Sequence, residues 1–155
     1  MQIDYLARHD HLLTESARRH FAEWSHSWPG DTVEARAKRL RLRCGNGGIP
    51  SVFVAFEGPA LCGSAGLIQN YLPNRPNLEP CLAGVYVTPS MRRQGIGTAL
   101  VSAVQNEARR RDITRLYRCS ATAERYYACR GCVVLERLHR RGELQAVIIL
   151  DLVLA

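Results

Sequence analysis

The apolar residues of this chain recur in stretches of helical and extended spacing that alternate along its length. Three stretches have the helical spacing of three to four residues: 10–24, 31–44 and 95–111. The second opens with Asp31-Thr32-Val33-Glu34, a capping-box pattern, and Gly45 ends it. The apolar faces of the three consist of Leu13, Ala17, Phe21 and Trp24; of Val33, Ala37, Leu40 and Cys44; and of Ile96, Leu100, Val104 and Ala108. The arginines of the second helix fall opposite its apolar face, so we expect them to point into solvent.

Extended stretches rich in β-branched and aromatic residues separate the helices. Gly58-Pro59 marks the turn of one hairpin, and Arg140-Arg141-Gly142-Glu143 marks the turn between the last two strands. A loop with three prolines spans 70–80, and a short helix over 122–130 ends at Gly131. The predicted strands cover 2–7, 51–57, 60–69, 81–88, 113–119, 132–139 and 144–154. Because hairpins come first and one strand-helix-strand crossover follows, we expect a mixed sheet flanked by helices on both faces.

The composition suits one globular domain over residues 1–155. The 155 residues are 46% hydrophobic and 23% charged, which provides for a buried core and argues against a disordered segment. No apolar stretch approaches the ~20 residues that cross a bilayer, and Met1 to Ala7 lacks the basic start and apolar run of a signal peptide. We therefore expect a cytoplasmic protein without a membrane partner.

Six cysteines accompany no secretion signal, so we expect reduced thiols. The pair Cys129-x-x-Cys132 could suggest zinc or redox chemistry. A structural zinc site needs four ligands, however, and only the distant Cys119 or His139 could complete this one. We therefore expect no metal.

The net charge is +7, and Lys38 is the only lysine among 21 basic residues. Arginine presents a planar fork that pairs well with phosphate, so the charge favours an anionic ligand. Nucleic acid would suit the same balance, but the arginines are dispersed and no run is longer than Arg109-Arg110-Arg111, which disfavours it. Charge alone therefore does not choose the partner.

One glycine-containing segment has the pattern of an anion site. Arg92-Arg93-Gln94-Gly95-Ile96-Gly97 stands where a strand ends and a helix begins, so its glycines let the backbone curl around a ligand and aim free N–H groups at it. The helix dipole adds about half a positive charge, which suits a pyrophosphate. A turn chosen only for its geometry has the same pattern. The segment lacks the lysine of a P-loop and the third glycine of a dinucleotide fingerprint, which excludes nucleotide hydrolysis and nicotinamide binding.

The segment from Leu82 to Leu100 resembles the acetyl-coenzyme A signature of the GNAT superfamily of N-acetyltransferases. It combines a strand that ends in Val-x-Pro, the turn Arg-x-x-Gly-x-Gly and an amphipathic helix. The segment from Ser120 to Gly131 resembles the family's second signature, in which a small helix carries a tyrosine four residues before a glycine, and Tyr127 occupies that place. The resemblance implies the GNAT fold, which is a mixed α/β fold with a central sheet of six to seven strands flanked by about four helices.

The resemblance also implies acetyl-CoA as the co-substrate. The backbone of Val85 and Val87 would hold the pantetheine arm as an added strand, and amides from Arg93 to Thr98 would bind the pyrophosphate. An extended thioester arm needs a free strand edge, which the family provides by splaying the strand at 81–88 away from its parallel neighbour at 113–119. The implied coenzyme-binding residues are Val85, Val87, Arg92, Arg93, Gln94, Gly95, Ile96, Gly97, Thr98 and Ser120. Ser120 departs from the asparagine that the family often has there.

The transfer needs a neutral amine, because an alkylammonium of pKa near ~10 has no lone pair, and an acid for the departing thiolate. The resemblance implies Tyr127 as that acid; a tyrosine packed in the core is the alternative. The position where some family members carry a catalytic glutamate falls on Cys81. Glu79, just before it, is the candidate base, acting directly or through water, and a solvated loop carboxylate is the alternative.

In this family the acceptor is held by the first two helices and the loop joining them, with loops that here cover 70–80 and 140–143. Glu23, Trp28 and Asp31 offer an aromatic wall and two acids for a cationic, ring-bearing amine. Trp24 falls on the apolar stripe of its helix, so we expect it in the core.

The stretch Glu-Trp-Ser-His…Pro-Gly-Asp-Thr resembles that of compact bacterial GNAT proteins, some of which modify aminoglycosides. The leading acceptor is therefore a primary amine of a small molecule, including an aminoglycoside-type antibiotic such as kasugamycin. A basic protein is an awkward host for a polycation, so a weakly charged or zwitterionic aminosugar suits better.

Two other functions stay open. The first is acetylation of a protein or peptide N-terminus, for which the same loops would form an open groove. The second is a non-catalytic module that binds coenzyme A or nucleic acid. We expect a monomer or a homodimer, with the long apolar strand at 144–154 as a candidate seam between copies.

Overall fold

A computed structural model describes residues 1–152 and contains one seven-stranded sheet in the order β1-β2-β3-β4-β5-β7-β6. The strands are β1 (Gln2–Tyr5), β2 (Ser51–Glu57), β3 (Ala60–Ile68), β4 (Cys81–Val87), β5 (Arg115–Ser120), β6 (Val133–Arg140) and β7 (Glu143–Asp151). Neighbouring strands are antiparallel except β4 and β5, which are parallel. The expected mixed sheet is confirmed.

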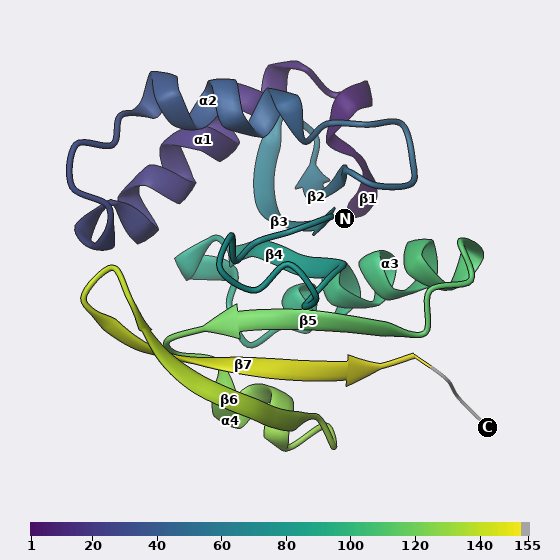
Figure 1. Ribbon diagram of the computed structural model, residues 1–155. Coiled ribbons are helices and arrows are strands. Elements are labelled where there is room, and N and C mark those ends of the chain that lie inside the picture. The colour runs from purple at the N-terminus through teal and green to yellow at the C-terminus, as the bar shows by residue number, and fades with distance from the viewer. Residues whose placement is uncertain (153–155) are drawn as a thin grey trace.

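Helices cover both faces of the sheet (Figure 1). They are α1 (His11–Trp24), α2 (Val33–Leu42), α3 (Ile96–Arg110) and α4 (Glu124–Ala128). On one face, α1 and α2 pack against β2 and β3 through Leu12, Leu13, Leu40 and Val54. On the other face, α3 buries the residues that its spacing predicted, which are Ile96, Leu100, Val104 and Ala108. Burial of these apolar stripes is what holds each helix on the sheet.

The ends of two helices differ from the predicted ends. The Thr32 hydroxyl accepts a hydrogen bond from the Ala35 N–H (3.0 Å), so Thr32 caps α2, but no acid stands at Ala35 to complete a capping box. The short helix α4 begins at Glu124 because the Ser120 hydroxyl accepts bonds from the N–H groups of Thr122 and Ala123, which form a turn instead.

A buried carboxylate joins three parts of the fold. Glu107, on α3, is 1% exposed and accepts hydrogen bonds from the Tyr5 hydroxyl, the Gly48 N–H (2.8 Å), Arg110 and Arg111. Burial alone would raise the pKa of Glu107, but these donors lower it to about 2. The carboxylate is therefore ionised and connects β1, the loop before β2 and α3.

A β-bulge in β4 produces the feature that positions the site. The register between β3 and β4 shifts so that Gly84 and Val85 lie opposite the single residue Ala65, and Gly84 has a φ of 61°. Beyond this point β4 turns away from β5, because the two strands pair only at Cys81 and Tyr117. The expected splay between these parallel strands is confirmed.

The last two strands form a hairpin whose turn residues, Arg141 and Gly142, both have positive φ (54° and 76°), as a type I′ turn requires. Strand β7 pairs with β5 on one side and β6 on the other. Within the candidate seam at 144–154, residues 146–149 are paired on both sides by strands of this chain, so this middle part offers no free edge to a second copy. Residues 153 and 154 lie outside the described part.

Candidate active site

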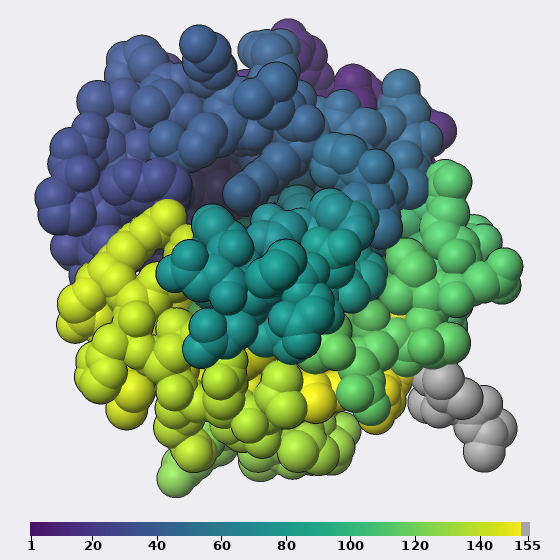
Figure 2. Space-filling model, in the orientation of Figure 1, coloured from purple at the N-terminus to yellow at the C-terminus, as the bar shows by residue number. Residues whose placement is uncertain are grey.

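The divergence of β4 from β5 opens into a cleft of about 1100 Å³. Its walls come from β4, the start of α3 and α4 at one end, and from α1, α2 and the β6–β7 turn at the other. Figure 2 shows the molecule hollowed between the layer of α1 and α2 and the loop 70–80, beside the β6–β7 hairpin. This volume exceeds what one drug-sized ligand fills, so the cleft has room for two reactants.

The first turn of α3 forms an anion cradle. Arg93 and Gly95 both adopt left-handed backbone conformations, with φ of 65° and 84°, immediately before the helix starts at Ile96. This curl directs the free N–H groups of the first helical turn toward the cleft, where the positive end of the helix dipole adds to them. A Cβ at Gly95 would meet nothing within 4 Å, so the backbone angle alone demands glycine.

Nine of the ten predicted coenzyme-binding residues line this cleft, and Gln94 does not. The nine are Val85, Val87, Arg92, Arg93, Gly95, Ile96, Gly97, Thr98 and Ser120. The side chains of two of these residues, Ser120 and Arg92, make hydrogen bonds within the protein. Ser120 caps the turn into α4, and Arg92 donates to the Val87 carbonyl (2.9 Å) and to both carboxylate oxygens of Glu23 (3.1 and 3.2 Å). Arg92 therefore connects α1 to the end of β4, a contact between residues far apart in the chain.

A second arginine reaches the cradle from the turn that follows α4. The Arg130 guanidinium lies over the Tyr126 ring (3.7 Å) and donates to the Thr98 hydroxyl (3.4 Å), which is also hydrogen-bonded to the Tyr126 hydroxyl (2.7 Å). Thr98 belongs to the first turn of α3, so these contacts fix α4 beside the cradle. No sequence pattern had assigned Arg130 to the site.

Tyr127 lines the same cleft and is only 2% exposed. Its ring meets that of Tyr126 edge to face, with centroids 4.9 Å apart. Burial raises the pKa of Tyr127, and the nearby Arg118 guanidinium opposes this without reversing it. The phenol is therefore protonated at neutral pH and able to donate a proton into the cleft.

Two buried polar residues of the cleft were missed by the sequence analysis. Arg118, on β5, is 9% exposed, and its Nε has no hydrogen-bond partner within residues 1–152. His20, on α1, is 7% exposed, with Nε2 2.8 Å from the hydroxyl of Ser64. That hydroxyl donates to the Gly84 carbonyl (3.0 Å), so His20 must donate its Nε2 proton. Burial lowers the pKa of His20 to about 3, so the imidazole is neutral.

The three residues predicted to receive a cationic acceptor already have cations of this chain beside them. Glu23 binds Arg92. The Asp31 side chain is fully buried against Arg36 and Arg39; burial alone would raise its pKa, but the two guanidinium groups keep the pKa low. Trp28 lines the cleft as predicted, but its ring faces Arg39 (4.1 Å) and Arg141 (3.5 Å).

Two expectations about α1 and α2 are wrong. The arginines of the helix predicted over 31–44 were expected in solvent, but Arg36, Arg39 and Arg43 line the cleft, and Asp31 pairs with Arg36 and Arg39 there. Among these arginines only Arg41, 62% exposed, behaves as expected. Trp24 was expected in the core but lines the cleft. The buried stripe of α1 ends instead at His20, against which Trp24 packs at 5.0 Å.

Glu79, the predicted base, lies outside the cleft lining. Its carboxylate accepts from the side-chain amides of Gln69 (2.8 Å) and Asn70 (3.5 Å). Cys81, at the position of the family's glutamate, is buried and donates its thiol proton to the Leu78 carbonyl (3.2 Å). Burial raises the pKa of Cys81 to about 11, so this thiol is not a base at neutral pH.

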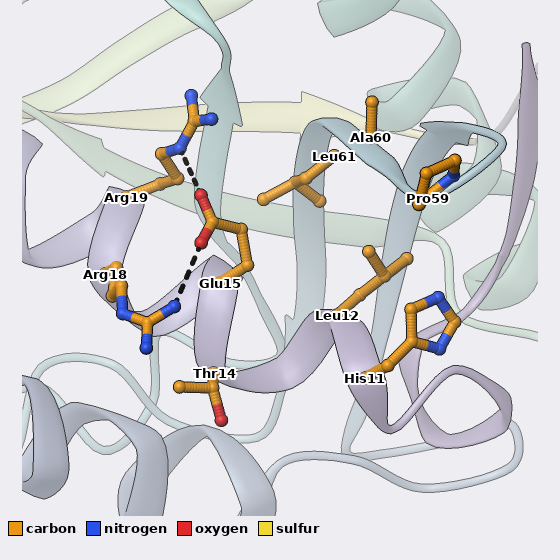
Figure 3. Close-up of a pocket in the computed structure, with 9 residues that line it drawn as sticks. All are labelled: His11, Leu12, Thr14, Glu15, Arg18, Arg19, Pro59, Ala60 and Leu61. Atoms are coloured by element: carbon orange, nitrogen blue, oxygen red, sulfur yellow. Dashed lines mark hydrogen bonds and ion pairs between the residues drawn. The ribbon is translucent and has the colours of Figure 1, made fainter.

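A second hollow, of about 550 Å³, lies between α1 and the turn from β2 to β3 (Figure 3). Its charged residues pair with one another, because the Glu15 carboxylate accepts from Arg18 (3.3 Å) and Arg19 (2.7 Å). Such pairs three and four residues apart stabilise a helix surface and need no ligand. This hollow therefore shows no chemistry of its own.

Within residues 1–152, all six cysteines are free, and no three His, Cys, Asp or Glu residues gather as metal ligands. In the same part of the chain, no helix combines the length and apolarity needed to cross a bilayer.

Comparisons with known proteins agree with this geometry. Residues 11–132 match the family model described as "Acetyltransferase (GNAT) family". An aminoglycoside 6'-N-acetyltransferase from Enterococcus faecium has a TM-score of 0.74 at 15% identity, covering 100% of this chain and 99% of that one. The putative acetyltransferase yncA from Salmonella typhimurium, solved with its cofactor acetyl-CoA, has a TM-score of 0.72 at 18% identity, covering 100% and 95%.

A ribosomal-protein-alanine N-acetyltransferase from Brucella melitensis has a TM-score of 0.73 at 19% identity, covering 97% of this chain and 99% of that one. At such identities these structures share the fold alone. Comparison with curated protein sequences gives no match.

Proposed function

The chain belongs to the GNAT acetyltransferase family, and from this premise we propose that it transfers the acetyl group of acetyl-CoA directly to a primary amine of a small molecule. One observation carries the proposal. Strand β4 leaves β5 after a single pair, and the opening lies between an anion cradle on α3 and a buried, protonated tyrosine on α4.

The residues present fit acetyl-CoA. Beyond the bulge, the main chain of Val85 and Val87 faces no strand on the β5 side, so it can pair with the extended pantetheine arm. The cradle at Gly95 and the N–H groups of the first turn of α3 suit a pyrophosphate, and Arg93 and Arg130 add positive charge at its edge. Arg92 acts indirectly, because its contacts hold the end of β4 in place.

In the transfer, the amine nitrogen attacks the thioester carbonyl, a C–N bond forms and the C–S bond breaks. Backbone N–H groups of the splayed strand polarise the carbonyl, and Tyr127 donates its phenolic proton to the departing thiolate. Glu79 lies outside the cleft and His20 is neutral with a pKa of about 3, so neither is suited to remove the proton of an ammonium group. We assign that proton to water in the cleft, from which the phenolate regains its own.

The way the cleft closes favours a small acceptor over a polypeptide. Arg141, in the β6–β7 turn, lies on the Trp28 ring (3.5 Å), and His26 contacts Glu143 (3.0 Å). These contacts join the α1–α2 loop to the hairpin and form a roof, whereas a peptide N-terminus needs an open groove. An aminoglycoside-type amine such as kasugamycin remains the finer proposal. The occupied acids favour a weakly charged or zwitterionic aminosugar among such compounds.

The experiment is thiol release from acetyl-CoA with a panel of small amines, aminosugars including kasugamycin, and peptides with free N-termini, together with calorimetric titration of coenzyme A. We expect heat on addition of coenzyme A and thiol release with small amines only. Release with peptides alone would refute the roofed acceptor site. An absence of heat from the folded protein would refute the acetyl-transfer proposal itself.

A further inference from the structure

The acceptor half of the cleft carries far more positive charge than acetyl transfer to an amine requires. Nine arginines but only two glutamates line the whole cleft. Three of the arginines, Arg92, Arg93 and Arg130, lie at the coenzyme end described above. The other six form what we call the arginine cluster: Arg36 and Arg39 from α2, Arg43 directly after it, Arg118 from β5, and Arg140 and Arg141 from the β6–β7 hairpin.

Only part of this charge is neutralised by the chain. Asp31 pairs with Arg36 and Arg39. The other four arginines of the cluster have no carboxylate partner within residues 1–152. Among these, Arg118 is nine-tenths buried with an unpartnered Nε. An unpartnered donor on a buried guanidinium is costly, so the Nε of Arg118 is a donor that a ligand or water can satisfy.

The members of the cluster lie near one another and near the reacting centre. Burial lowers the pKa of Arg43, and the positive charges of Arg39, Arg36 and Arg140 lower it further, while Tyr71 opposes the change. These four arginines are therefore close enough for their charges to act on one another. Arg118 opposes the rise in the pKa of Tyr127, as described above, so this member of the cluster lies close to the proposed acid.

The guanidinium groups of Arg140 and Arg141, in the β6–β7 hairpin, each stack on an aromatic ring. Arg140 lies over Tyr71 (4.5 Å) and Arg141 over Trp28 (3.5 Å). A guanidinium stacked in this way keeps its N–H edge free, and that edge matches the two oxygens of a carboxylate or phosphate. The cluster therefore presents oriented donors rather than diffuse charge.

We propose that the acceptor carries a carboxylate or phosphate group besides its amine, and that Arg43, Arg118 and Arg140 bind this group while the amine faces the thioester. This inference rests on the proposed acetyl transfer and names the class of its acceptor. It also accounts for the occupied acids: Glu23 and Asp31 hold arginines in place instead of receiving a cation.

The first test uses amines that differ only in the anionic group. Glucosamine, glucosamine 6-phosphate and muramic acid share the same amine. Glucosamine carries no anionic group, glucosamine 6-phosphate carries a phosphate and muramic acid carries a carboxylate. Phenylethylamine and phenylalanine form a second pair, of which only phenylalanine carries a carboxylate. Thiol release gives kcat/KM, and the thermal stability of the protein with coenzyme A gives binding without turnover. We expect the anionic members to exceed the neutral ones by roughly 10-fold to 100-fold, and the sugars to show which anion is preferred. Equal values for neutral and anionic members would overturn the proposal.

The second test removes single donors. Arg43→Gln and Arg140→Gln should raise KM for the anionic acceptor by about 10-fold or more and leave KM for the neutral one unchanged. Arg118→Gln is informative only where circular dichroism shows a native fold, because Arg118 is buried. Arg137→Gln is the matched control, since Arg137 lies on β6 outside the cleft and is half exposed against Glu124. A KM increase for both acceptors would show a merely structural role and refute the assignment.

The two proposals fail in different ways. Anion-dependent binding without thiol release would refute acetyl transfer and leave the anion site standing. Acetyl transfer to neutral and anionic amines at equal rates would refute the anion site and leave the acetyl-transfer proposal standing. Binding that Arg137→Gln weakens as much as Arg140→Gln does would reduce the cluster to general electrostatics and overturn the specific site.

Discussion

Replacement of Tyr127 by phenylalanine tests the catalytic arrangement most directly. The substitution removes one oxygen from a side chain that is 2% exposed and keeps the ring that packs against Tyr126. The fold should therefore persist. The thiolate would leave without a positioned acid, and a general acid contributes roughly 100-fold to 10,000-fold to rate.

A thiolate is a better leaving group than an alkoxide, so we expect the low end of that range. This means a fall in kcat of about 100-fold, or about 2.7 kcal/mol of transition-state stabilisation. Coenzyme affinity should change by less than roughly threefold, because the cradle at Gly95 and the free edge of β4 are untouched. Thiol release and calorimetric titration of coenzyme A measure the two quantities.

The pH dependence adds a sharper criterion. Burial raises the pKa of Tyr127 above its ordinary value near ~10, so the phenol stays protonated through about pH 9. The ratio of wild-type to Tyr127→Phe rates should then be constant from about pH 6 to pH 9. Tyr126→Phe is the matched control, since it loses the same atom but breaks the bond to Thr98 instead. Equal rates for wild type and Tyr127→Phe would remove Tyr127 from the mechanism.

Three further predictions concern the cradle, the bulge and the buried carboxylate. Gly97→Glu should abolish the heat of coenzyme A binding, because it adds a long side chain and a negative charge at the cradle, where a Cβ already lies 3.4 Å from the Val87 side chain. Gly97→Ala should keep measurable affinity, and retained affinity in Gly97→Glu would show that the pyrophosphate lies elsewhere. Gly84→Ala should lower the free energy of unfolding in urea by ~1–2 kcal/mol through its φ of 61° alone, since a Cβ meets nothing within 4 Å; an unchanged stability would contradict the strain. Glu107→Gln should destabilise the protein by about 3 kcal/mol at neutral pH. Because the pKa of Glu107 is lowered to about 2 in the folded state, this stabilisation is present above about pH 4.5 and is lost as the pH falls toward 2, so a difference that did not shrink at about pH 3 would refute it.

The elements and the coenzyme end follow from local patterns. The apolar positions of α3 recur every four residues and are all buried, and the glycine at 95 occupies the left-handed position that its turn demands. These features depend on residues close in sequence, so a linear reading finds them. The splay of β4 followed only from the resemblance, although Gly84 inside a strand is its local cause.

The acceptor end was predicted less well because its contacts join distant residues. Asp31 and Arg36 are close in sequence, but Arg92 meets Glu23 and Arg141 meets Trp28 although each pair is far apart in the chain. No local pattern shows that these acids and rings are already occupied.

Signals for the two missed residues were present in the sequence. Arg118 is a charged residue inside a strand whose neighbours Leu116 and Cys119 are buried, and His20 falls on the apolar stripe three residues after Ala17. A charge or imidazole at a core position either has an unseen partner or faces a cavity. Here both face the cleft.

The roof over the acceptor pocket links Trp28 and His26 to Arg141 and Glu143, near the two ends of the chain. The coenzyme end, by contrast, is built from one continuous stretch between β4 and α4. Most of the proposed acceptor site and the proposed coenzyme site therefore come from separate parts of the polypeptide, with Arg118 of β5 as the member of the arginine cluster that lies inside the coenzyme stretch. Under the proposed function, substitutions in the outer segments would change which amine is accepted and leave the coenzyme contacts in place.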